Sequence, residues 1–222
     1  MSDYQGTIKY WNQVFGDVDQ YDPKEKLSVE KIEVALEWLS ANTKNVIDFG
    51  CGHGRLLSRL LTCGVERICG MDISEQAISL ARQVMKENGL EDRSSFICGG
   101  LESLEQIESD YFDGAILSNI IDNMLPEEGE RVLKEISRIV KPGGKVFLKL
   151  NPYLPPEMLA DLEDYTLLED NLYQESTGVY LWNLSNKQVE NIIKDNFKLD
   201  RYQELEIEGH SLVSRLYYLI NK

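Results

Sequence analysis

The chain has 222 residues, of which 42% are hydrophobic and 27% are charged, so it can fold around one core and is neither a disordered nor a disulfide-stapled chain. Its formal net charge of −15 would repel a phosphate backbone, and we therefore expect no nucleic-acid partner. The longest apolar runs fall far short of the ~18 residues of a membrane span, and the first residues carry no signal-peptide pattern, so we expect a soluble, cytoplasmic protein without a membrane partner.

The first part of the chain, residues 1–44, is predicted to be a helical leader that carries several aromatic residues, with a helix over Val29 to Leu39. From Asn45 to Leu150, short apolar runs alternate with helical patterns, which is typical of a doubly wound parallel sheet. The predicted strands are 45–49, 67–72, 94–98, 112–118 and 145–150. Helices are expected over 55–61, after Ser74 as an N-cap, and from Pro126 onward.

The pattern changes in residues 151–184, which we interpret as an acidic and aromatic insertion. From Asn151 to Asn186 the chain holds seven acidic residues and no Lys or Arg. Two interpretations remain open at this point. The acidic and aromatic side chains attract and stack on a cationic or amine substrate, or the acids form the solvated face of one helix. The acids are Glu157, Asp161, Glu163, Asp164, Glu169, Asp170 and Glu175.

The last part, residues 185–222, is predicted to hold a helix from Ser185 to Asn196 and two β segments, 197–207 and 211–220, that pair antiparallel. The predicted fold class is therefore α/β: a Rossmann-like, doubly wound, mostly parallel seven-stranded sheet with an antiparallel C-terminal hairpin. We expect residues 1–222 to form a single domain whose cofactor-binding core is 45–150.

A glycine-rich turn follows the first predicted strand. Glycines at 50, 52 and 54 allow the backbone to turn tightly and to approach a ligand closely. Position 55 is Arg, where a dinucleotide fingerprint requires a third glycine, and no Gly-Lys-Ser/Thr ends the loop. These departures disfavour NAD, FAD, ATP and GTP.

Two aspartates end the first and second predicted strands. Asp48, beside the glycine turn, would repel a pyrophosphate but suits an ammonium group. Asp72 lies where a carboxylate in this topology accepts hydrogen bonds from ribose hydroxyls. Together they indicate a nucleoside that carries an amino-acid tail.

At these residues the chain resembles the class I S-adenosylmethionine-dependent methyltransferases of small-molecule type, from about Asp48 to Leu150. The resemblance implies S-adenosyl-L-methionine as the cofactor, with the glycine loop around its methionine portion, Asp72 at the ribose and Ile73 against the adenine. It further implies that the end of the fourth strand faces the cofactor. The residues carried over are Asp48, Gly50, Cys51, Gly52, Gly54, Asp72, Ile73, Gly100, Leu101, Ser118, Asn119 and Ile120.

The sequence departs from this family at two places. Position 100 is Gly, where the family usually has the Asp that binds the adenine amino group, which leaves backbone groups at Gly100 and Leu101 to hold the adenine edge. Many small-molecule members continue after the fourth strand with His-His, where this chain has Asp122 and Asn123.

Methyl transfer depends mainly on positioning, but an alcohol, phenol or ammonium acceptor must also lose a proton. The candidate bases are Asp122 and His210, each of which has a structural alternative, as a loop or helix-cap acid and as a turn residue. In related enzymes the leader closes over the cofactor, so Tyr10, Trp11 and Tyr21 are candidate cofactor contacts, with core packing as the alternative.

The four cysteines match no zinc or redox spacing, and we expect reduced thiols and no metal. The leading hypothesis is S-adenosylmethionine-dependent methylation of a small-molecule acceptor at an O, N or C atom, with a cationic or amine molecule as one candidate acceptor. The alternatives are a catalytically inactive S-adenosylmethionine-binding or regulatory module and, with less support, an NAD(P) oxidoreductase. The sequence gives no oligomeric state.

Overall fold

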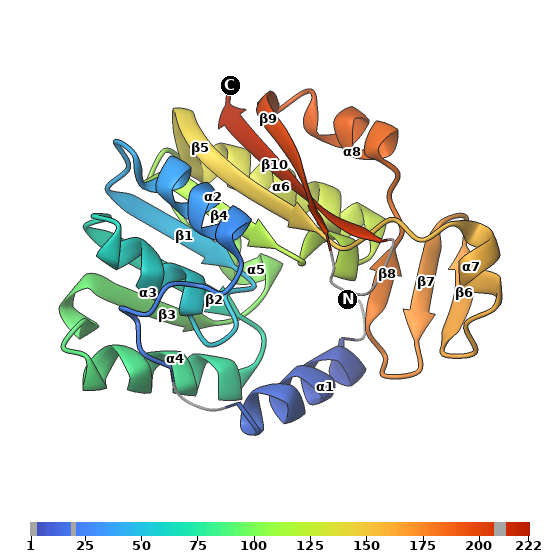
Figure 1. Ribbon diagram of the computed structural model, residues 1–222, viewed down its shortest axis with the longest axis horizontal. Helices are drawn as coiled ribbons and strands as arrows, with labels where there is room; N and C mark the ends of the chain where they lie inside the picture. Colours follow the sequence, from blue (N-terminus) through green and yellow to red (C-terminus); the bar gives the residue numbers. More distant parts are fainter. Residues whose placement is uncertain (1–3, 19–20, 207–211) are drawn as a thin grey trace.

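The computed structural model describes residues 4–18, 21–206 and 212–222, and its centre is a seven-stranded sheet in the order β3-β2-β1-β4-β5-β10-β9 (Figure 1). β1 to β5 run parallel, and β10 is antiparallel to both β5 and β9, which confirms the predicted fold class. The strands are β1 (Asn45–Phe49), β2 (Arg67–Asp72), β3 (Ser94–Cys98), β4 (Phe112–Ser118), β5 (Val140–Leu150), β9 (Phe197–Glu206) and β10 (Val213–Asn221). The carboxyl ends of β1 to β5 therefore share one edge.

Helices cover both faces of this sheet. One apolar cluster joins it to α2 (Glu30–Ser40), α3 (Arg55–Thr62) and α4 (Glu75–Glu87). The other cluster joins it to α5 (Leu101–Leu104), α6 (Pro126–Ile139) and α8 (Asn186–Ile193). The predicted N-cap at Ser74 is present, since its Oγ accepts a hydrogen bond from the backbone N–H of Ala77 (3.1 Å). Short 3₁₀ turns, η1 (Glu91–Arg93) and η2 (Ile121–Asn123), precede β3 and α6.

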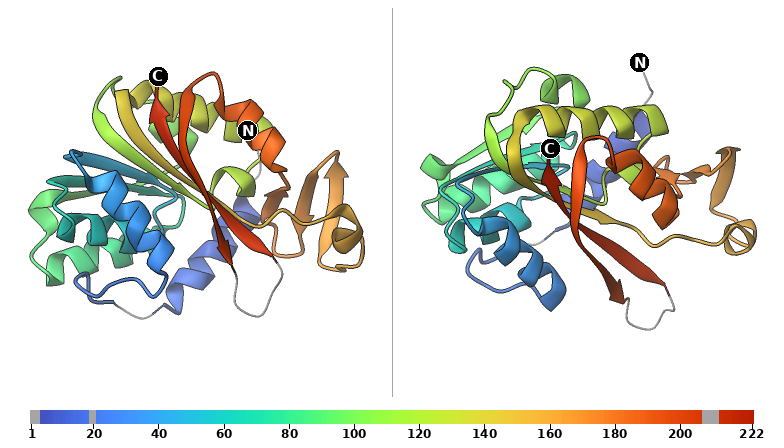
Figure 2. Two further views of the ribbon diagram at one scale, coloured as in Figure 1. Left: turned by 45° about the horizontal axis from the view of Figure 1, so that its top comes forward. Right: turned by 90° about the horizontal axis from the view of Figure 1, so that it is seen from above.

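The acidic insertion folds as an antiparallel accessory sheet that stands to one side of the main sheet (Figure 2). It comprises β6 (Tyr165–Glu169), β7 (Leu172–Glu175) and β8 (Tyr180–Trp182), preceded by the short helix α7 (Pro156–Ala160). The interpretation of its acids as one solvated helix face was wrong, because they are divided among α7, the turns and two strands. A positive φ of 39° at Asp170 makes the turn between β6 and β7.

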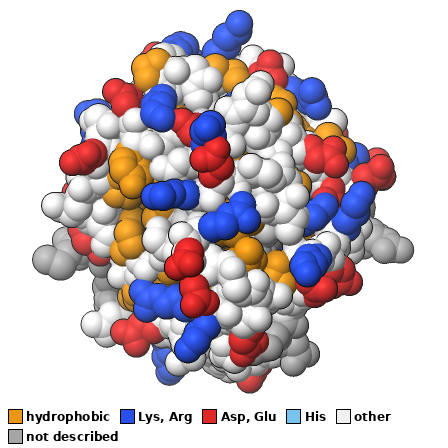
Figure 3. Space-filling view, turned by 90° about the vertical axis from the view of Figure 1, so that its left-hand side faces the viewer, with side chains coloured by type: hydrophobic (Ala, Val, Ile, Leu, Met, Phe, Trp, Pro, Cys, Tyr) orange, Lys and Arg blue, Asp and Glu red, His pale blue; other side chains and the backbone are white. Residues whose placement is uncertain are grey.

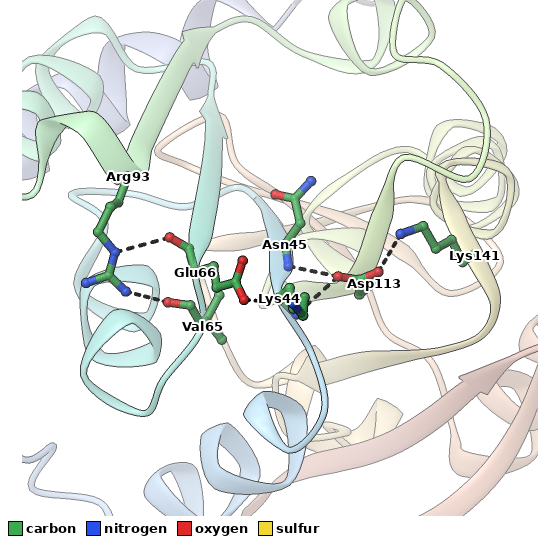
Figure 4. Close-up of polar contacts among 7 residues, drawn as sticks. All are labelled: Lys44, Asn45, Val65, Glu66, Arg93, Asp113 and Lys141. Carbon is green, nitrogen blue, oxygen red and sulfur yellow. Dashed lines mark hydrogen bonds and ion pairs between the residues drawn. The ribbon is translucent and has the colours of Figure 1, made fainter.

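Polar contacts tie the amino ends of the strands together, at the edge opposite the carboxyl ends (Figure 4). Asp113 of β4 accepts hydrogen bonds from the backbone N–H groups of Lys44 (3.1 Å) and Asn45 (3.0 Å) and pairs with Lys141 (2.6 Å). The guanidinium of Arg93 donates to the carbonyls of Val65 (2.6 Å) and Glu66 (3.1 Å). These bonds fix the amino ends of β1, β2, β3 and β4 relative to one another.

On the side that Figure 3 shows, Lys and Arg side chains lie among acidic and hydrophobic ones. A hollow of about 430 Å³ opens at the amino ends of the strands, between Arg67, Ile97 and Tyr111. None of the residues expected to bind a cofactor or to act as a base lines it. Within the described ranges, no helix combines the length and apolar character needed to cross a bilayer.

Gly129 of α6 gives a test of how the accessory sheet is seated. A Cβ at this position would lie 3.0 Å from the carbonyl oxygen of Ile121 and 3.0 Å from the Trp182 ring of β8. In an exposed helix Gly→Ala adds about 1 kcal/mol of stability, but this overpacking outweighs that gain, and we expect Gly129→Ala to lower the free energy of unfolding by about 1 kcal/mol. Urea denaturation measures the change. Gly16→Ala is the matched control, because no atom lies within 4 Å of its Cβ; equal stabilisation by both substitutions would contradict the expectation.

Candidate active site

A cleft of about 980 Å³ opens at the carboxyl edge of the main sheet. Its wall is built by the loop after β1, the end of β2, the start of α5, the end of β4 and helix α1 (Gln5–Gly16). Ten of the predicted cofactor residues line it: Trp11, Gly50, Gly52, Asp72, Ile73, Gly100, Leu101, Ser118, Asn119 and Ile120. Parts of the chain that are far apart in sequence thus meet where the topology predicts a ligand.

The glycine loop is held in its turn by backbone bonds and left-handed residues. Gly50 and Gly52 have φ values of 80° and 52°, and the N–H groups of Gly50 and Cys51 donate to the carbonyl of Met71 (2.7 and 3.0 Å). A Cβ at Gly50 would lie 2.8 Å from Ile120, and one at Gly52 would lie 2.8 Å from the Phe15 ring. Both positions therefore require glycine, for conformation and for space.

Asp72 joins the glycine loop to α4. Its Oδ2 accepts a hydrogen bond from the backbone N–H of Gly52 (2.8 Å), and its Oδ1 accepts one from the N–H of Ser74 (2.9 Å). Burial raises the pKa of this carboxyl, and the N–H groups of Ser74 and Gly52 oppose the rise. Each oxygen keeps a further lone pair, so the carboxylate is able to accept bonds from a ligand as well.

Asp48 lies behind the glycine loop and does not line the cleft. Its side chain is 1% exposed, and Oδ1 has no hydrogen-bond partner among the described residues. Burial raises the pKa of this carboxyl well above its usual range, and the nearby Asp72 charge raises it further. An orphaned carboxylate oxygen beneath a glycine loop fits a ligand that brings a positively charged amino group.

Two other predicted cofactor residues, Cys51 and Gly54, also lie behind the wall. The Cys51 thiol packs so closely on β2 that a Cβ at Gly70 would lie 2.8 Å from its Sγ. Gly54, with a φ of 80°, is the N-cap of α3. Both shape the loop by packing and conformation.

The end of β4 is fixed by Asn119, a non-glycine residue with a φ of 54°. Its backbone N–H donates to the carbonyl of Lys149 (2.8 Å), and its Oδ1 accepts a hydrogen bond from Lys149 Nζ (2.6 Å). Burial lowers the pKa of Lys149, and the Asp122 carboxyl opposes this shift. Main chain and side chain together thus hold Asn119 against the cleft in a conformation that Asn tolerates better than most residues.

Asp122, one of the two candidate bases, does not line the cleft. Asp122, in η2, is 1% exposed and lies behind the wall, where Oδ2 accepts a hydrogen bond from the Asn151 backbone N–H (2.7 Å) and Oδ1 has no partner in the described structure. Burial raises the pKa of Asp122, whereas the hydrogen bond from the Asn151 N–H and the positive charge of Arg215 act to lower it. His210 lies outside the described residues. A base role for either residue stays a prediction.

Helix α1, which lies between α4 and β8 in Figure 1, lines the cleft and is held by hydrogen bonds toward both ends. At one end, Ser74 Oγ donates to Asn12 Oδ1 (2.8 Å). At the other, Thr7 Oγ1 donates to the Gly178 carbonyl (3.0 Å), and the Tyr4 hydroxyl donates to the Glu128 carboxylate. We call this helix the α1 strap.

The leader aromatics take different positions around the strap. Trp11 faces the cleft, with its ring stacked 5.9 Å from that of Phe15, whereas Tyr10 packs edge-on against Trp11 and does not line the cleft. Tyr21 also lies away from the wall, where its hydroxyl donates to the His53 carbonyl (3.0 Å) beneath the Arg55 guanidinium. The leader thus contributes one of its three predicted contacts directly.

The cleft also contains residues that the sequence did not single out. Many of these are apolar, such as Phe15, but five are acidic and one is an arginine, and the charged ones come from α5 and the residue after it, from α6 and from β6. Their acidic character was visible in the sequence, but no motif placed them at one site. These charged residues are Glu102, Glu105, Glu127, Glu128, Arg131 and Glu169.

Comparisons with known proteins show that the chain is similar to methyltransferases. Residues 46–144 match the family model described as a methyltransferase domain. The ribosomal protein L11 methyltransferase of Shewanella piezotolerans is 33% identical over 118 residues, which are 52% of this chain and 37% of that protein. The tRNA N(3)-methylcytidine methyltransferase of Schizosaccharomyces pombe is 23% identical over 202 residues, which are 86% of this chain and 64% of that protein. The chain thus spans less than two thirds of either relative.

A solved structure is similar over nearly the whole chain. The Burkholderia thailandensis 1,6-didemethyltoxoflavin-N1-methyltransferase, with 1,6-didemethyltoxoflavin and S-adenosylhomocysteine bound, has a TM-score of 0.69 at 15% identity and covers 99% of this chain and 86% of that one. This likeness shows the fold. The names of these three proteins give a protein, a tRNA and a small molecule as acceptors, so the comparisons select none of them. Residues 46–144 thus match a methyltransferase domain, and with its strand order and glycine loop the chain is similar to the class I S-adenosylmethionine-dependent methyltransferases.

Proposed function

We propose that this protein transfers a methyl group from S-adenosylmethionine to an amine nitrogen of a small, positively charged molecule. The observation that carries the proposal is the charge of the cleft wall. Six carboxylates line the cleft, those of Asp72, Glu102, Glu105, Glu127, Glu128 and Glu169, against the single guanidinium of Arg131. A wall of this charge attracts cations and repels anions.

The carboxylates are not equally available to an acceptor. Glu105 pairs with Arg131, and Glu128 accepts the Tyr4 hydroxyl. Glu127 of α6 and Glu169 of β6 have no partner among the described residues. These two come from different elements, the main body and the accessory sheet, and we assign them to the recognition of the cationic acceptor.

Different residues would have different roles in the reaction. S-adenosylmethionine supplies the methyl group on a positively charged sulfur. Asp72 would hold the ribose of the cofactor, Asp48 would act on its amino-acid end through charge from behind the glycine loop, and Asn119 would fix the wall beside them. Because displacement depends mostly on the alignment of the two reacting atoms, most of the rate enhancement comes from this positioning. A carboxylate of the wall takes the proton that the acceptor ammonium loses.

The size and charge of the cleft favour a small acceptor. A volume of about 980 Å³ must hold the cofactor together with the acceptor, which leaves space for a small molecule. A nucleic-acid acceptor fits poorly, since its phosphates would meet both the acidic wall and a net charge of −15.

The proposal is tested by methyl-transfer assays with matched acceptors, each amine compared with the alcohol and the carboxylate of the same skeleton. We expect transfer to amines, with a KM that rises with salt. Replacing both Glu127→Gln and Glu169→Gln should raise the KM for the amine roughly 10-fold and leave that for S-adenosylmethionine unchanged. Glu157→Gln, an exposed acid of α7, is the control. Cofactor binding with no turnover on any acceptor would favour the inactive module instead.

Asp72 provides a test of the cofactor site itself. Asp72→Asn removes the charge that strengthens hydrogen bonds to a ribose, so we expect S-adenosylhomocysteine to bind about 1–3 kcal/mol more weakly. Isothermal titration calorimetry measures the difference. An unchanged dissociation constant would reject the ribose assignment. Thermal unfolding of the variant without ligand reports separately on the two backbone bonds that Asp72 accepts.

The buried Asp48 carboxyl predicts a pH dependence of stability. Its pKa is raised in the folded protein, so its contribution to stability is complete below the pKa of the unfolded chain and is lost as pH rises through the folded value. Asp48→Asn removes this loss. We expect the variant without ligand to become more stable relative to the wild type as pH rises, in urea titrations from pH 5 to 8. A difference that stays constant, as expected for the exposed Asp92→Asn control, would show that Asp48 is not the group involved.

A further inference from the structure

At the start of α5, the carboxylate of Glu102 lies beside Gly100, a residue that has no side chain. Gly100 precedes the helix, and Glu102 lies in its first turn. The Glu102 side chain folds back, so that Oε1 accepts a hydrogen bond from the Gly100 backbone N–H (3.2 Å). A Cβ at Gly100 would lie 3.2 Å from Glu102 Oε2 and 3.5 Å from Ile73 Cγ2. The carboxylate therefore occupies the space that a side chain at position 100 would enter.

The surroundings of this carboxylate are those of a site for a flat ring with an amino group at its edge. Ile73 and Leu101 supply apolar surface, and both line the cleft together with Gly100 and Glu102. Glu102 Oε2 accepts no bond from any residue that the structure describes. A carboxylate oxygen only accepts hydrogen bonds, so a ligand group that meets it must donate one.

The backbone cannot supply this recognition at position 100. The backbone acceptor there, the Gly100 carbonyl, already accepts the N–H groups of Ser103 (3.0 Å) and Leu104 (3.2 Å). The residue next to the ribose-binding Asp72 is the apolar Ile73. The base of the cofactor extends to this end of the cleft from a ribose at Asp72. Its 6-amino group is a donor, whereas a 6-oxo group would bring an acceptor oxygen against a carboxylate.

We propose that Glu102 accepts the hydrogen bond from the adenine 6-amino group and that its charge makes the protein select an adenosyl over an inosyl cofactor. The inference rests on the methyltransferase assignment of the cleft, which is part of the proposed function, but not on the identity of the acceptor. Glu102, two positions after Gly100, would thus provide the acidic group that position 100 lacks.

The experiment is calorimetry on the full chain with S-adenosylhomocysteine and with S-inosylhomocysteine, its 6-oxo counterpart. We expect the wild type to bind the adenosyl compound at least 10-fold more tightly. In Glu102→Gln the amide donates as well as accepts, so the preference should fall to about 3-fold or less. Glu108→Gln, which removes an acid at the amino-edge hollow, should keep the wild-type preference.

A second variant tests the position of the charge. Gly100 has a φ of −114°, outside the left-handed region, and an added Cβ would lie 3.2 Å from the flexible end of the side chain at position 102. A small shift of that side chain, Glu or Gln, accommodates Asp. We expect Gly100→Asp combined with Glu102→Gln to restore the adenosyl preference. Circular dichroism and thermal unfolding check that each variant is folded. If the double variant does not fold, the result with Glu102→Gln alone tests the role of Glu102.

The outcomes separate the inference from the function on which it rests. An undiminished preference in Glu102→Gln, or equal weakening of both compounds, would overturn the role of Glu102. A wild type that binds both compounds equally would overturn it as well. Failure of the wild type to bind either compound would instead overturn the cofactor assignment.

Discussion

The carboxylate of Asp72 is the constraint on which the site depends. It accepts one backbone N–H from the glycine loop and one from the start of α4, and so fixes two elements at the end of β2. Ser74, whose N–H is one of these donors, also caps α4 and holds Asn12 of the α1 strap. A single acidic side chain therefore sets the spacing between loop, helix and strap before any ligand binds. Preorganisation of this kind reduces the entropy that a bound molecule must lose.

Charge is distributed unevenly between the two edges of the sheet. At the amino edge the acids are neutralised, with Asp113 against Lys141 and Glu66 against Lys44. At the carboxyl edge, Asp48 and Asp122 are buried and each keeps one oxygen without a partner in the described structure. Burying such groups is unfavourable for folding. For Asp48, which lies beneath the glycine loop, the proposed positively charged ligand would offset part of this cost.

The sequence was sufficient for the main sheet and for most of the cofactor wall. Strands buried on both faces read as short apolar runs between helical patterns, and the glycine spacing and the acid at position 72 depend on local backbone geometry, which sequence reports directly. The side-chain direction of Asp122 was not predictable, because η2 turns its carboxylate toward Asn151 and away from the cleft. The accessory sheet was missed because β6, β7 and β8 are short, and β6 is mostly exposed and lacks the alternation of a half-buried strand. The presence of Glu127 and Glu169 at one cleft is a tertiary arrangement that no local pattern encodes.

The fastening of the α1 strap at both ends has a kinetic consequence. Its Asn12 end contacts Ser74 at the start of α4, and its Tyr4 and Thr7 end contacts α6 and the loop before β8. Detachment of this one helix would uncover the cleft along its whole length. We therefore expect the proposed cofactor and acceptor to exchange through one shared opening, at rates set by how often the helix detaches.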